Sequence, residues 1–567
     1  MAGEFQVDGH NTAALFTLKI HRGDGMSLVA MNWKSGKPPL NFVGFAIEYK
    51  EPGGDKFFAL KNRLCFPTAN KTDANRLSTL QSPIQKFRWV HFPRSADLAG
   101  EFTYRVSPVF MNDRNELSLG EVQEAKIELR RETYPGQLNV AFTRGFVSSQ
   151  AFVEKYKTVK GILPTTAAKS LGFKATNPKA PEALAWMGFE AHQEILGVLD
   201  KALADIHAQV RVVAYDLNEP EIVDRLVKLG TRLKVIVDDS GSHKKKGSAE
   251  NEAAKRLIVS AGSANVKRQH MGQLQHNKFI AVHGPKTQLV VCGSTNFSWR
   301  AFFVQNNNAV VMQGPNPVKQ FLAAFDNYWS NNNVKGFAAT KSVDWTSLGL
   351  SGIDAKVSFS PHSKPNARLQ SIADDVAKQT TSSLLYSLAF LYESPGVVKN
   401  AIVKVTKSKS LFVYGISDKK VGGIVLQKPD GNLAPLFPAA LSGNLPEPFK
   451  SEPTGGSGTR MHHKFLVIDF DKPSARVYLG SYNFSTPADV KNGENLLILR
   501  DQRIAVSYLV EALSMLDHYH FRVAQLDAKK KRKKLELALP PRKTGQKAWW
   551  EEYFTVARKI RDRTLFS

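Results

Sequence analysis

The sequence predicts an α/β protein in which an N-terminal all-β sandwich precedes two similar α/β halves. Three observations lead to this prediction: short alternating runs fill the first 135 residues, strand and helix patterns alternate after about residue 137, and a pair of polar motifs occurs twice. Of the 567 residues 42% are apolar and 23% charged, which excludes wholesale disorder and a fibrous repeat. We expect three domains, over residues 1–135, 136–345 and 346–567.

The first 135 residues consist of short runs with a period of two, which turn-forming clusters separate. The runs are ALFTLKI, MSLVAMNW, VGFAIEYK, KFFALKN, FTYRVSPVF and EVQEAKIEL. This spacing predicts a small antiparallel β-sandwich. The strand order, with Trp33 early and Tyr104 late, resembles a fibronectin type III domain, and another immunoglobulin-like sandwich is the alternative. We expect this domain to position or bind, since it contains no catalytic set.

The later α/β pattern begins with a strand over 209–217, a helix over 218–230 that starts at Asn218 and stops at Gly230, and a strand over 232–239. These elements and their short links predict a right-handed parallel unit. The second half repeats the pattern as a strand, a helix followed by a strand, and another strand, over 356–361, 367–391 and 410–418.

Two further segments carry predictions. The insertion 419–460 is rich in proline and glycine, and we expect it to form a wall or lid of a pocket, with a disordered loop as the alternative. The aromatic segment 549–554 is expected to cap the second half, with a membrane interface as the alternative.

Charge and cysteine content limit the class of protein. The formal net charge of +26 predicts attraction to polyanions, nucleic acid first and anionic membranes second, although a merely solubilising surface would also be basic. Two cysteines, Cys65 and Cys292, exclude a disulfide framework and a four-cysteine zinc site. No signal-like segment or run of about 18 apolar residues occurs, so we expect a soluble cytoplasmic protein.

The two halves share a pair of motifs. These are HNKF (276–279) followed by GSTNFS (293–298), and HHKF (462–465) followed by GSYNFS (480–485). The glycine follows the histidine by 17 residues in the first half and by 18 in the second. A coincidence this detailed indicates an internal duplication.

The spacing brings chemically useful groups together. Residues i and i+2 of a strand point the same way, so each histidine lies beside the lysine of its motif. Each half thus offers an imidazole, an ammonium, an amide and a hydroxyl group: His276, Lys278, Asn296 and Ser294 in the first, His462, Lys464, Asn483 and Ser481 in the second. If the two halves face each other, the pocket between them would suit a phosphodiester, because the lysines and asparagines can bind its non-bridging oxygens. One histidine can attack phosphorus while the other protonates the leaving oxygen.

These paired motifs resemble the phospholipase D superfamily, whose signature is His-x-Lys-x4-Asp followed by Gly-Ser-x-Asn or Gly-Ser-x-x-Asn. The resemblance covers roughly residues 140–530. It implies two pseudo-symmetric lobes, each a mixed sheet flanked by helices, with one site at their seam. It also implies a covalent phosphohistidine intermediate that water resolves, with His276 as nucleophile and His462 as the acid. Lipases, nucleases and phosphodiesterases share this chemistry.

The sequence departs from the family pattern in two places. The motif aspartate is Asp469 in the second half, where an odd spacing makes it a supporting residue, but His283 takes its place in the first. The family's histidine-orienting carboxylate corresponds to Glu494, and its first-half equivalent is Asn307. The two histidines should therefore differ in basicity, and if Asn307 serves His276 the roles could reverse.

No metal or cofactor is demanded, because the histidines lack Asp, Glu or Cys partners at zinc spacing. His463 alternates to the face opposite His462 and is expected to be structural. One chain carries both motifs, so a monomer should be catalytically complete, whatever its oligomeric state.

The substrate has to be inferred from the surroundings of the motifs. Basic clusters at 242–247, 267–268 and 529–534, with Arg460, favour a long polyanion bound through its phosphates in a salt-dependent way. We therefore favour a metal-independent, non-specific nuclease on DNA or RNA. A phospholipase D that cleaves head groups of the phosphatidylcholine type is the first alternative, with anionic membrane as its partner. A non-enzymatic nucleic-acid-binding scaffold is the second.

Overall fold

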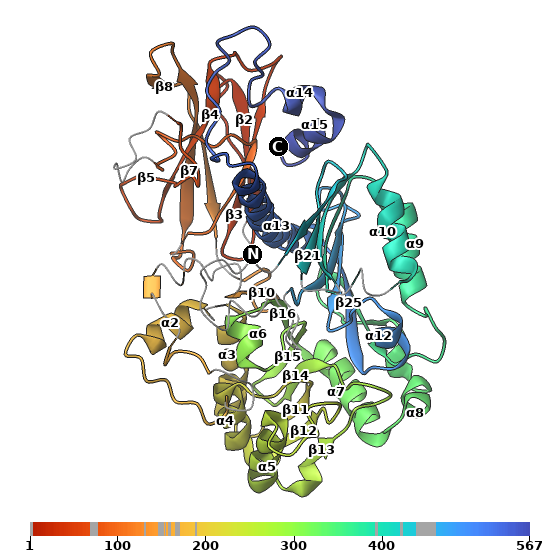
Figure 1. The fold of residues 1–567 in the computed structure, drawn as a ribbon. Helices are drawn as coiled ribbons and strands as arrows, with labels where there is room; N and C mark the ends of the chain where they lie inside the picture. Colours follow the sequence, from red (N-terminus) through yellow and green to blue (C-terminus); the bar gives the residue numbers. More distant parts are fainter. Residues whose placement is uncertain are drawn as a thin grey trace.

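The computed structural model has an all-β region beside two α/β lobes (Figure 1). It describes residues 4–67, 77–93, 95–129, 132–145, 152, 155–156, 160–164, 170–187, 190–389, 391, 395–419, 423–437 and 461–567. Both α/β lobes contain mixed sheets flanked by helices, as predicted. None of the helices in the described ranges is long and apolar enough to cross a membrane.

The N-terminal region consists of two antiparallel sheets. The first contains β1 (Gln6–Asp8), β2 (Phe16–Arg22), β3 (Ser27–Trp33) and β6 (Arg88–His91). The second contains β5 (Phe58–Ala59), β4 (Phe42–Lys50), β7 (Glu101–Met111) and β8 (Leu117–Leu119), with β9 (Gln123–Glu128) also on β7. Alternate residues of both sheets meet in one apolar cluster, in which Tyr104 is fully buried and Trp33 almost so. The likeness to fibronectin type III stays a prediction.

The first lobe is built on a seven-stranded sheet. Its strands, in spatial order, are β10 (Leu138–Arg144), β16 (Asn306–Gln313), β15 (Gln288–Gly293), β14 (Lys278–His283), β11 (Gln209–Ala214), β12 (Leu233–Val237) and β13 (Val266–Arg268). The helices are α2 (Ala180–Met187), α3 (Ala191–Ala204), α4 (Pro220–Leu229), α5 (Ala249–Ala261), α6 (Trp299–Phe303), α7 (Pro315–Ser330) and α8 (Val334–Ala338). The predicted parallel unit is β11-α4-β12, but α4 is capped by Glu219 instead of Asn218, because the Glu219 carboxylate accepts the Ile222 N–H at 2.8 Å.

The second lobe repeats this strand order. Its nine strands are β17 (Thr346–Ser347), β18 (Asp354–Ser360), β25 (Glu494–Arg500), β24 (Arg476–Gly480), β23 (Lys464–Ile468), β19 (Ser383–Leu388), β20 (Phe412–Lys419), β21 (Gly423–Gln427) and β22 (Leu433–Leu436). The helices are α9 (Leu369–Gln379), α10 (Val397–Thr406), α12 (Thr486–Val490) and α13 (Gln502–Lys530). Six strands from β18 to β20 match six from β10 to β12 in order and direction.

The insertion 419–460 begins with β21 and β22, which extend the second sheet as an antiparallel pair. The predicted wall or lid falls mainly on residues 438–460, which lie outside the described residues.

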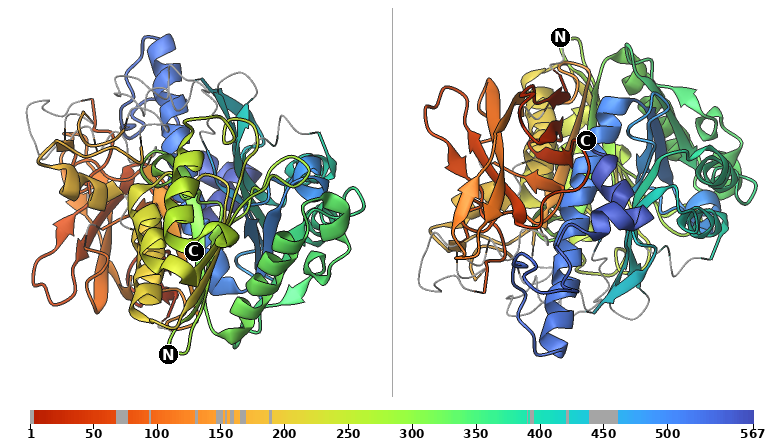
Figure 2. Two further views of the ribbon diagram at one scale, coloured as in Figure 1. Left: turned by 90° about the horizontal axis from the view of Figure 1, so that it is seen from below. Right: turned by 90° about the horizontal axis from the view of Figure 1, so that it is seen from above.

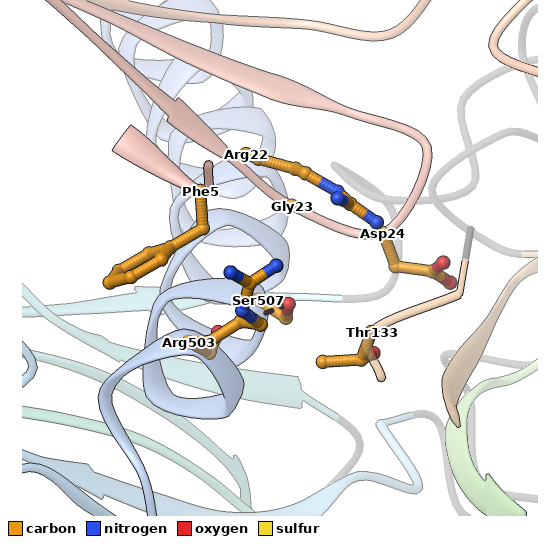
Figure 3. Close-up of a pocket in the computed structure, with 7 residues that line it drawn as sticks. All are labelled: Phe5, Arg22, Gly23, Asp24, Thr133, Arg503 and Ser507. Atoms are coloured by element: carbon orange, nitrogen blue, oxygen red, sulfur yellow. Dashed lines mark hydrogen bonds between the residues drawn. The ribbon is translucent and has the colours of Figure 1, made fainter. Parts of the chain in front are cut away.

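Helix α13 links the second lobe to the N-terminal region. It contacts β24 of the second lobe and β2 of the N-terminal region, and Figure 1 shows it running between them. A small pocket at this junction is lined by Phe5, Arg22, Gly23, Asp24, Thr133, Arg503 and Ser507 (Figure 3). The Arg503 guanidinium lies 5.1 Å from the centre of the Phe5 ring, so the pocket belongs to the packing of the sandwich on α13.

The C-terminal segment returns to the β-sandwich. It carries α14 (Glu552–Thr555) and α15 (Ala557–Thr564), which lie beside the sandwich in Figure 2. The Trp549 ring packs 5.5 Å from Phe42 and 5.4 Å from Phe87, and its indole N–H donates to the Phe42 carbonyl. The prediction that residues 549–554 cap the second lobe was therefore wrong, because Trp550 and Tyr553 are buried in the apolar core of the sandwich and Trp549 packs against it.

Candidate active site

The two histidines of the duplicated motifs lie together at the seam between the lobes. The ring centres of His276 and His462 are 6.5 Å apart, and the rings are inclined by 66°. Each histidine stands two residues before the lysine that begins β14 or β23. Both side chains are buried, so the two lobes bring the imidazoles into one site.

Each histidine is held by a residue of the opposite lobe. The Nδ1 atom of His276 lies 2.8 Å from Oε2 of Glu494, and Nδ1 of His462 lies 2.6 Å from Oδ1 of Asn307. The Ser294 carbonyl oxygen is a second partner of the His462 Nδ1 atom, at 3.0 Å. Since both Nδ1 atoms are engaged, Nε2 is the ring nitrogen that each histidine can offer to a substrate.

This crossed pairing follows from how the lobes meet. Gln275 and Gly493 form a bridge between the lobes, and Asn306 and Met461 form its pseudo-symmetric counterpart. Gln275 precedes His276 and Gly493 precedes Glu494, so the first bridge brings His276 next to Glu494. Met461 precedes His462 and Asn306 precedes Asn307, so the second bridge brings His462 next to Asn307. The possibility that Asn307 serves His276 is therefore wrong, because Asn307 reaches the histidine of the other lobe.

The two motif lysines, Lys278 and Lys464, are almost fully buried. The Lys278 ammonium donates to the His276 carbonyl at 2.5 Å, and the Lys464 ammonium donates to the His462 carbonyl at 2.8 Å. Lys278 also lies 4.8 Å from the centre of the Tyr215 ring. Each ammonium uses one of its three N–H donors to bond the backbone carbonyl of its motif histidine, and this bond holds it beside that histidine.

The serines and asparagines of the glycine segments have different roles. The Ser481 hydroxyl donates to Glu494 at 2.6 Å, and the Ser294 hydroxyl faces Asn307 at 3.4 Å, so both serines support the residues that hold the histidines. The carboxamide oxygens of Asn296 and Asn483 have no hydrogen-bond partner within the described part of the chain. The Asn296 amide nitrogen donates to Asp216 at 2.7 Å.

Burial and positive charge lower the proton affinity of the site. Burial lowers the pKa of His276, and Glu494 opposes this fall. Burial, reinforced by both lysines, lowers the pKa of His462 well below its usual value. Burial also lowers the pKa of Lys278 to about 8, and that of Lys464 falls well below its usual value. An anion bound here would restore positive charge to these groups, because opposite charge favours their protonated forms.

The glycines that open the Gly-Ser segments are needed for packing between strands. Gly293 and Gly480 have φ of 140° and 141°, a region that side chains disfavour. A Cβ on Gly480 would lie 2.2 Å from the Asn495 carbonyl oxygen, and one on Gly293 would lie 2.5 Å from that of Asn308. Each glycine therefore lets its strand approach the backbone of the neighbouring strand in the same lobe.

Asp469 and His283 occupy equivalent positions with different surroundings. The Asp469 carboxylate is fully buried and accepts the backbone N–H groups of residues 381–383, at 2.8–3.0 Å. His283 is exposed at the end of β14, where Nδ1 contacts the Gln288 side chain at 3.1 Å. Neither touches the paired histidines, and Asp469 secures the turn between α9 and β19.

Sequence reasoning missed a network on the first-lobe side of the site. The His243 ring lies between two carboxylates, with Nε2 3.1 Å from Asp216 and Nδ1 2.8 Å from Asp238. Asp238 also accepts the backbone N–H of Gln275, the residue before His276, at 2.7 Å. Asp216 and Asp238 follow the carboxyl ends of the parallel strands β11 and β12, and this position is the signal that could have identified them.

Two groups of side chains in the described ranges are close enough to share a metal ion. They are His192 with Glu219 and Glu221, and His243 with Asp216 and Glu250. Burial alone would lower the pKa of His243, but Asp216 and Asp238 raise it to about 10. The two carboxylates thus favour the protonated form of the ring, in which both nitrogens carry a proton. His463 is fully buried, with Nε2 3.4 Å from the Glu511 carboxylate of α13.

Comparisons with known proteins relate segments of both lobes to one family model. Residues 199–329 and 438–516 match the family model described as "Cardiolipin synthase, PLD-like domain", so part of each lobe is similar to a phospholipase D-like domain. A 48-residue stretch is 46% identical to a "Phospholipase D" of Rickettsia conorii, and this match covers 8% of the present chain and 22% of that protein. The chain thus spans less than a quarter of the length of that relative.

Two solved structures that match this chain have low sequence identity and TM-scores below 0.5. The phosphatidylserine synthase of Haemophilus influenzae is 12% identical, with a TM-score of 0.41 over 60% of this chain and 91% of that one. The yeast tyrosyl-DNA phosphodiesterase is 11% identical, with a TM-score of 0.28 over 52% of this chain and 84% of that one.

Proposed function

We propose that this protein is a phosphodiesterase that works through a covalent phosphohistidine and cleaves nucleic acid without needing a metal ion. The observation that supports the chemistry is the pairing of His276 and His462, with ring centres 6.5 Å apart and a buried lysine bonded to the backbone carbonyl of each. A phosphodiester between the rings would have its non-bridging oxygens near Lys278 and Lys464. Buried ammonium groups stabilise the charge that develops on these oxygens in the transition state.

The reaction would have two steps. In the first, Nε2 of one histidine forms a bond to phosphorus as the bond to the leaving oxygen breaks, and the other histidine gives that oxygen its proton. In the second, water attacks phosphorus, the nitrogen–phosphorus bond breaks, and the second histidine takes the proton of the water. Both histidines end in their starting states, and the net reaction is hydrolysis.

The partners of the histidines support His276 as the nucleophile. A ring that attacks phosphorus gains positive charge in the transition state, and the carboxylate of Glu494 stabilises that charge. A ring that acts as the acid loses positive charge, and the neutral amide of Asn307 does not oppose the loss. Catalysis depends on interactions that strengthen in the transition state, so each partner fits one role.

The net charge of +26 supports nucleic acid as the substrate, because Lys and Arg side chains neutralise backbone phosphates. The test is an activity panel with EDTA that contains single- and double-stranded DNA, RNA and phosphatidylcholine vesicles. We expect nucleic acid to be cleaved by the wild type, and neither His276→Ala nor His462→Ala to do so. Full activity in either variant would overturn the proposed site.

A phospholipase is the second candidate, since the matching family model and the Rickettsia relative carry lipid-related names. Release of head group from the vesicles without cleavage of any nucleic acid would select it. A protein that binds nucleic acid but cleaves no member of the panel would be the scaffold considered above.

A further inference from the structure

The loop between β12 and α5, residues 240–248, forms a basic rim beside the histidines. Its sequence is Ser-Gly-Ser-His-Lys-Lys-Lys-Gly-Ser, and Lys244, Lys245 and Lys246 are exposed. We propose that this basic rim binds the phosphates that flank the scissile phosphodiester in a nucleic-acid strand. The proposal rests on the nuclease function, and it identifies the surface along which the bound strand extends away from the paired histidines.

The first argument is position. His243 of the basic rim is buried, and its ring lies 3.1 Å from Asp216, whose carboxylate holds the Asn296 amide at 2.7 Å. The Tyr215 ring lies 4.7 Å from both the His243 ring and the His276 ring. One aromatic ring thus separates the basic rim from a candidate catalytic histidine.

The second argument is that the backbone of the basic rim is held in place before any ligand binds. The Arg268 guanidinium donates to the carbonyls of Asp238 and His243 at 2.8 and 2.9 Å. The Asn251 amide donates to the carbonyls of Lys244 and Lys245 at 3.2 and 2.6 Å. A strand bound here would not have to order the loop, so less binding energy would be lost.

The third argument separates nucleic acid from a membrane surface. Interfacial membrane binding normally combines basic side chains with apolar ones that enter the lipid. The basic rim contains only serine, glycine, histidine and lysine, so it has charge for phosphates and no apolar side chain to insert. A phosphate backbone matches this composition, because it is bound mainly through charge.

The experiment compares two triple variants. Lys244, Lys245 and Lys246 are changed to Gln in the test variant, and Lys404, Lys407 and Lys409 in the control. The control lysines are also exposed and precede the start of β20, whereas Lys464 lies level with the other end of that strand. The control therefore removes the same charge away from the site. The assay measures kcat/KM for a single-stranded oligonucleotide of about 20 nucleotides and for bis(p-nitrophenyl) phosphate, over a range of KCl concentrations with EDTA.

We divide kcat/KM for the oligonucleotide by kcat/KM for the small diester. We expect this ratio to fall at least about tenfold in the rim variant and to stay within about twofold of wild type in the control. For the oligonucleotide, the slope of log(kcat/KM) against log[KCl] should become shallower by about 2 in the rim variant. Each lost contact to a single-strand phosphate contributes about 0.7, and the variant loses three lysines.

Other results would overturn the proposal in distinguishable ways. If the wild type cleaves the oligonucleotide and the two triple variants behave alike, the basic rim has no role in strand binding and the nuclease function stands. If the wild type cleaves the small diester and phosphatidylcholine vesicles but no oligonucleotide, the nuclease function fails. If only binding to phosphatidylglycerol vesicles falls in the rim variant, the basic rim serves a membrane.

Discussion

At the scale of single residues, the two lobes supply unequal partners to equivalent histidines. Glu494 offers a full negative charge to His276, whereas Asn307 offers His462 a neutral carbonyl oxygen. The fold therefore makes the imidazoles near-equivalent in position, while one amide-for-carboxylate difference makes them unequal in basicity. This inequality leads to two predictions about the division of labour.

The first prediction identifies the nucleophile. A thymidine p-nitrophenyl phosphodiester has a leaving group that needs little protonation, so loss of the acid should spare the first step. We expect His462→Ala to release a burst of p-nitrophenolate and to retain a phosphoryl adduct on His276, detectable by mass spectrometry of alkaline digests. His276→Ala should show neither. An adduct on His462 in the His276 variant would reverse the assignment.

The second prediction concerns the pH dependence of the acid. Asn307→Asp places a carboxylate beside His462, which raises the pKa of that histidine and keeps it protonated to higher pH. The alkaline limb of the kcat profile should move upward by roughly one to three pH units, while the plateau falls because a weaker acid transfers its proton less readily. Glu494→Gln is the matched comparison, and it should lower activity without that upward shift. An unmoved alkaline limb in Asn307→Asp would contradict the role of His462.

At the scale of elements, the sequence allowed the strands and the paired motifs to be predicted, but not the contacts between lobes. Alternation and short links were enough for β11, α4 and β12, because those signals are local. Glu494 and His276 are 218 residues apart and meet only when the lobes pack, so no local pattern pairs them. Asp216 was missed because a single carboxylate after a strand is common, and its use depends on Asn296 from another segment.

The motif aspartate gives a prediction about an element rather than about chemistry. Asp469 has φ of 51° and accepts backbone N–H groups from the turn before β19. Asp469→Asn should lower the free energy of unfolding by about 2 kcal/mol, since it removes charge-assisted hydrogen bonds. The kcat of the folded variant should stay near that of wild type. His283→Ala, at the equivalent exposed position, is the control and should be almost neutral in urea unfolding. A large loss of kcat with unchanged stability would mean that Asp469 acts on the chemistry.

At the scale of the whole molecule, the β-sandwich is tied to both the second lobe and the C-terminus. Arg88 of β6 is buried, and its guanidinium contacts Asp517 of α13 at 2.6 Å and Asp562 of α15 at 2.8 Å. The aromatic segment 549–554 adds apolar contacts with the core of the sandwich. The sandwich is thus integrated with the catalytic lobes, and we expect it to unfold together with them.

The last prediction tests this connection. Arg88→Met leaves two buried carboxylates without their main cation and should lower the free energy of unfolding by about 3–5 kcal/mol. Arg500→Met removes an exposed ion pair with Asp354 and should cost no more than about 1 kcal/mol.

Although burial alone would raise the pKa of Asp517, Arg88 and Lys86 lower it below its usual value. A carboxyl group with a lowered pKa stabilises the fold above the pKa of an unfolded aspartate, about 3.9, and loses this contribution as the pH falls below it. Wild type should therefore lose more stability than Arg88→Met between about pH 5 and pH 3. Parallel losses in thermal unfolding of the two proteins would show that Arg88 does not connect the parts of the molecule through Asp517.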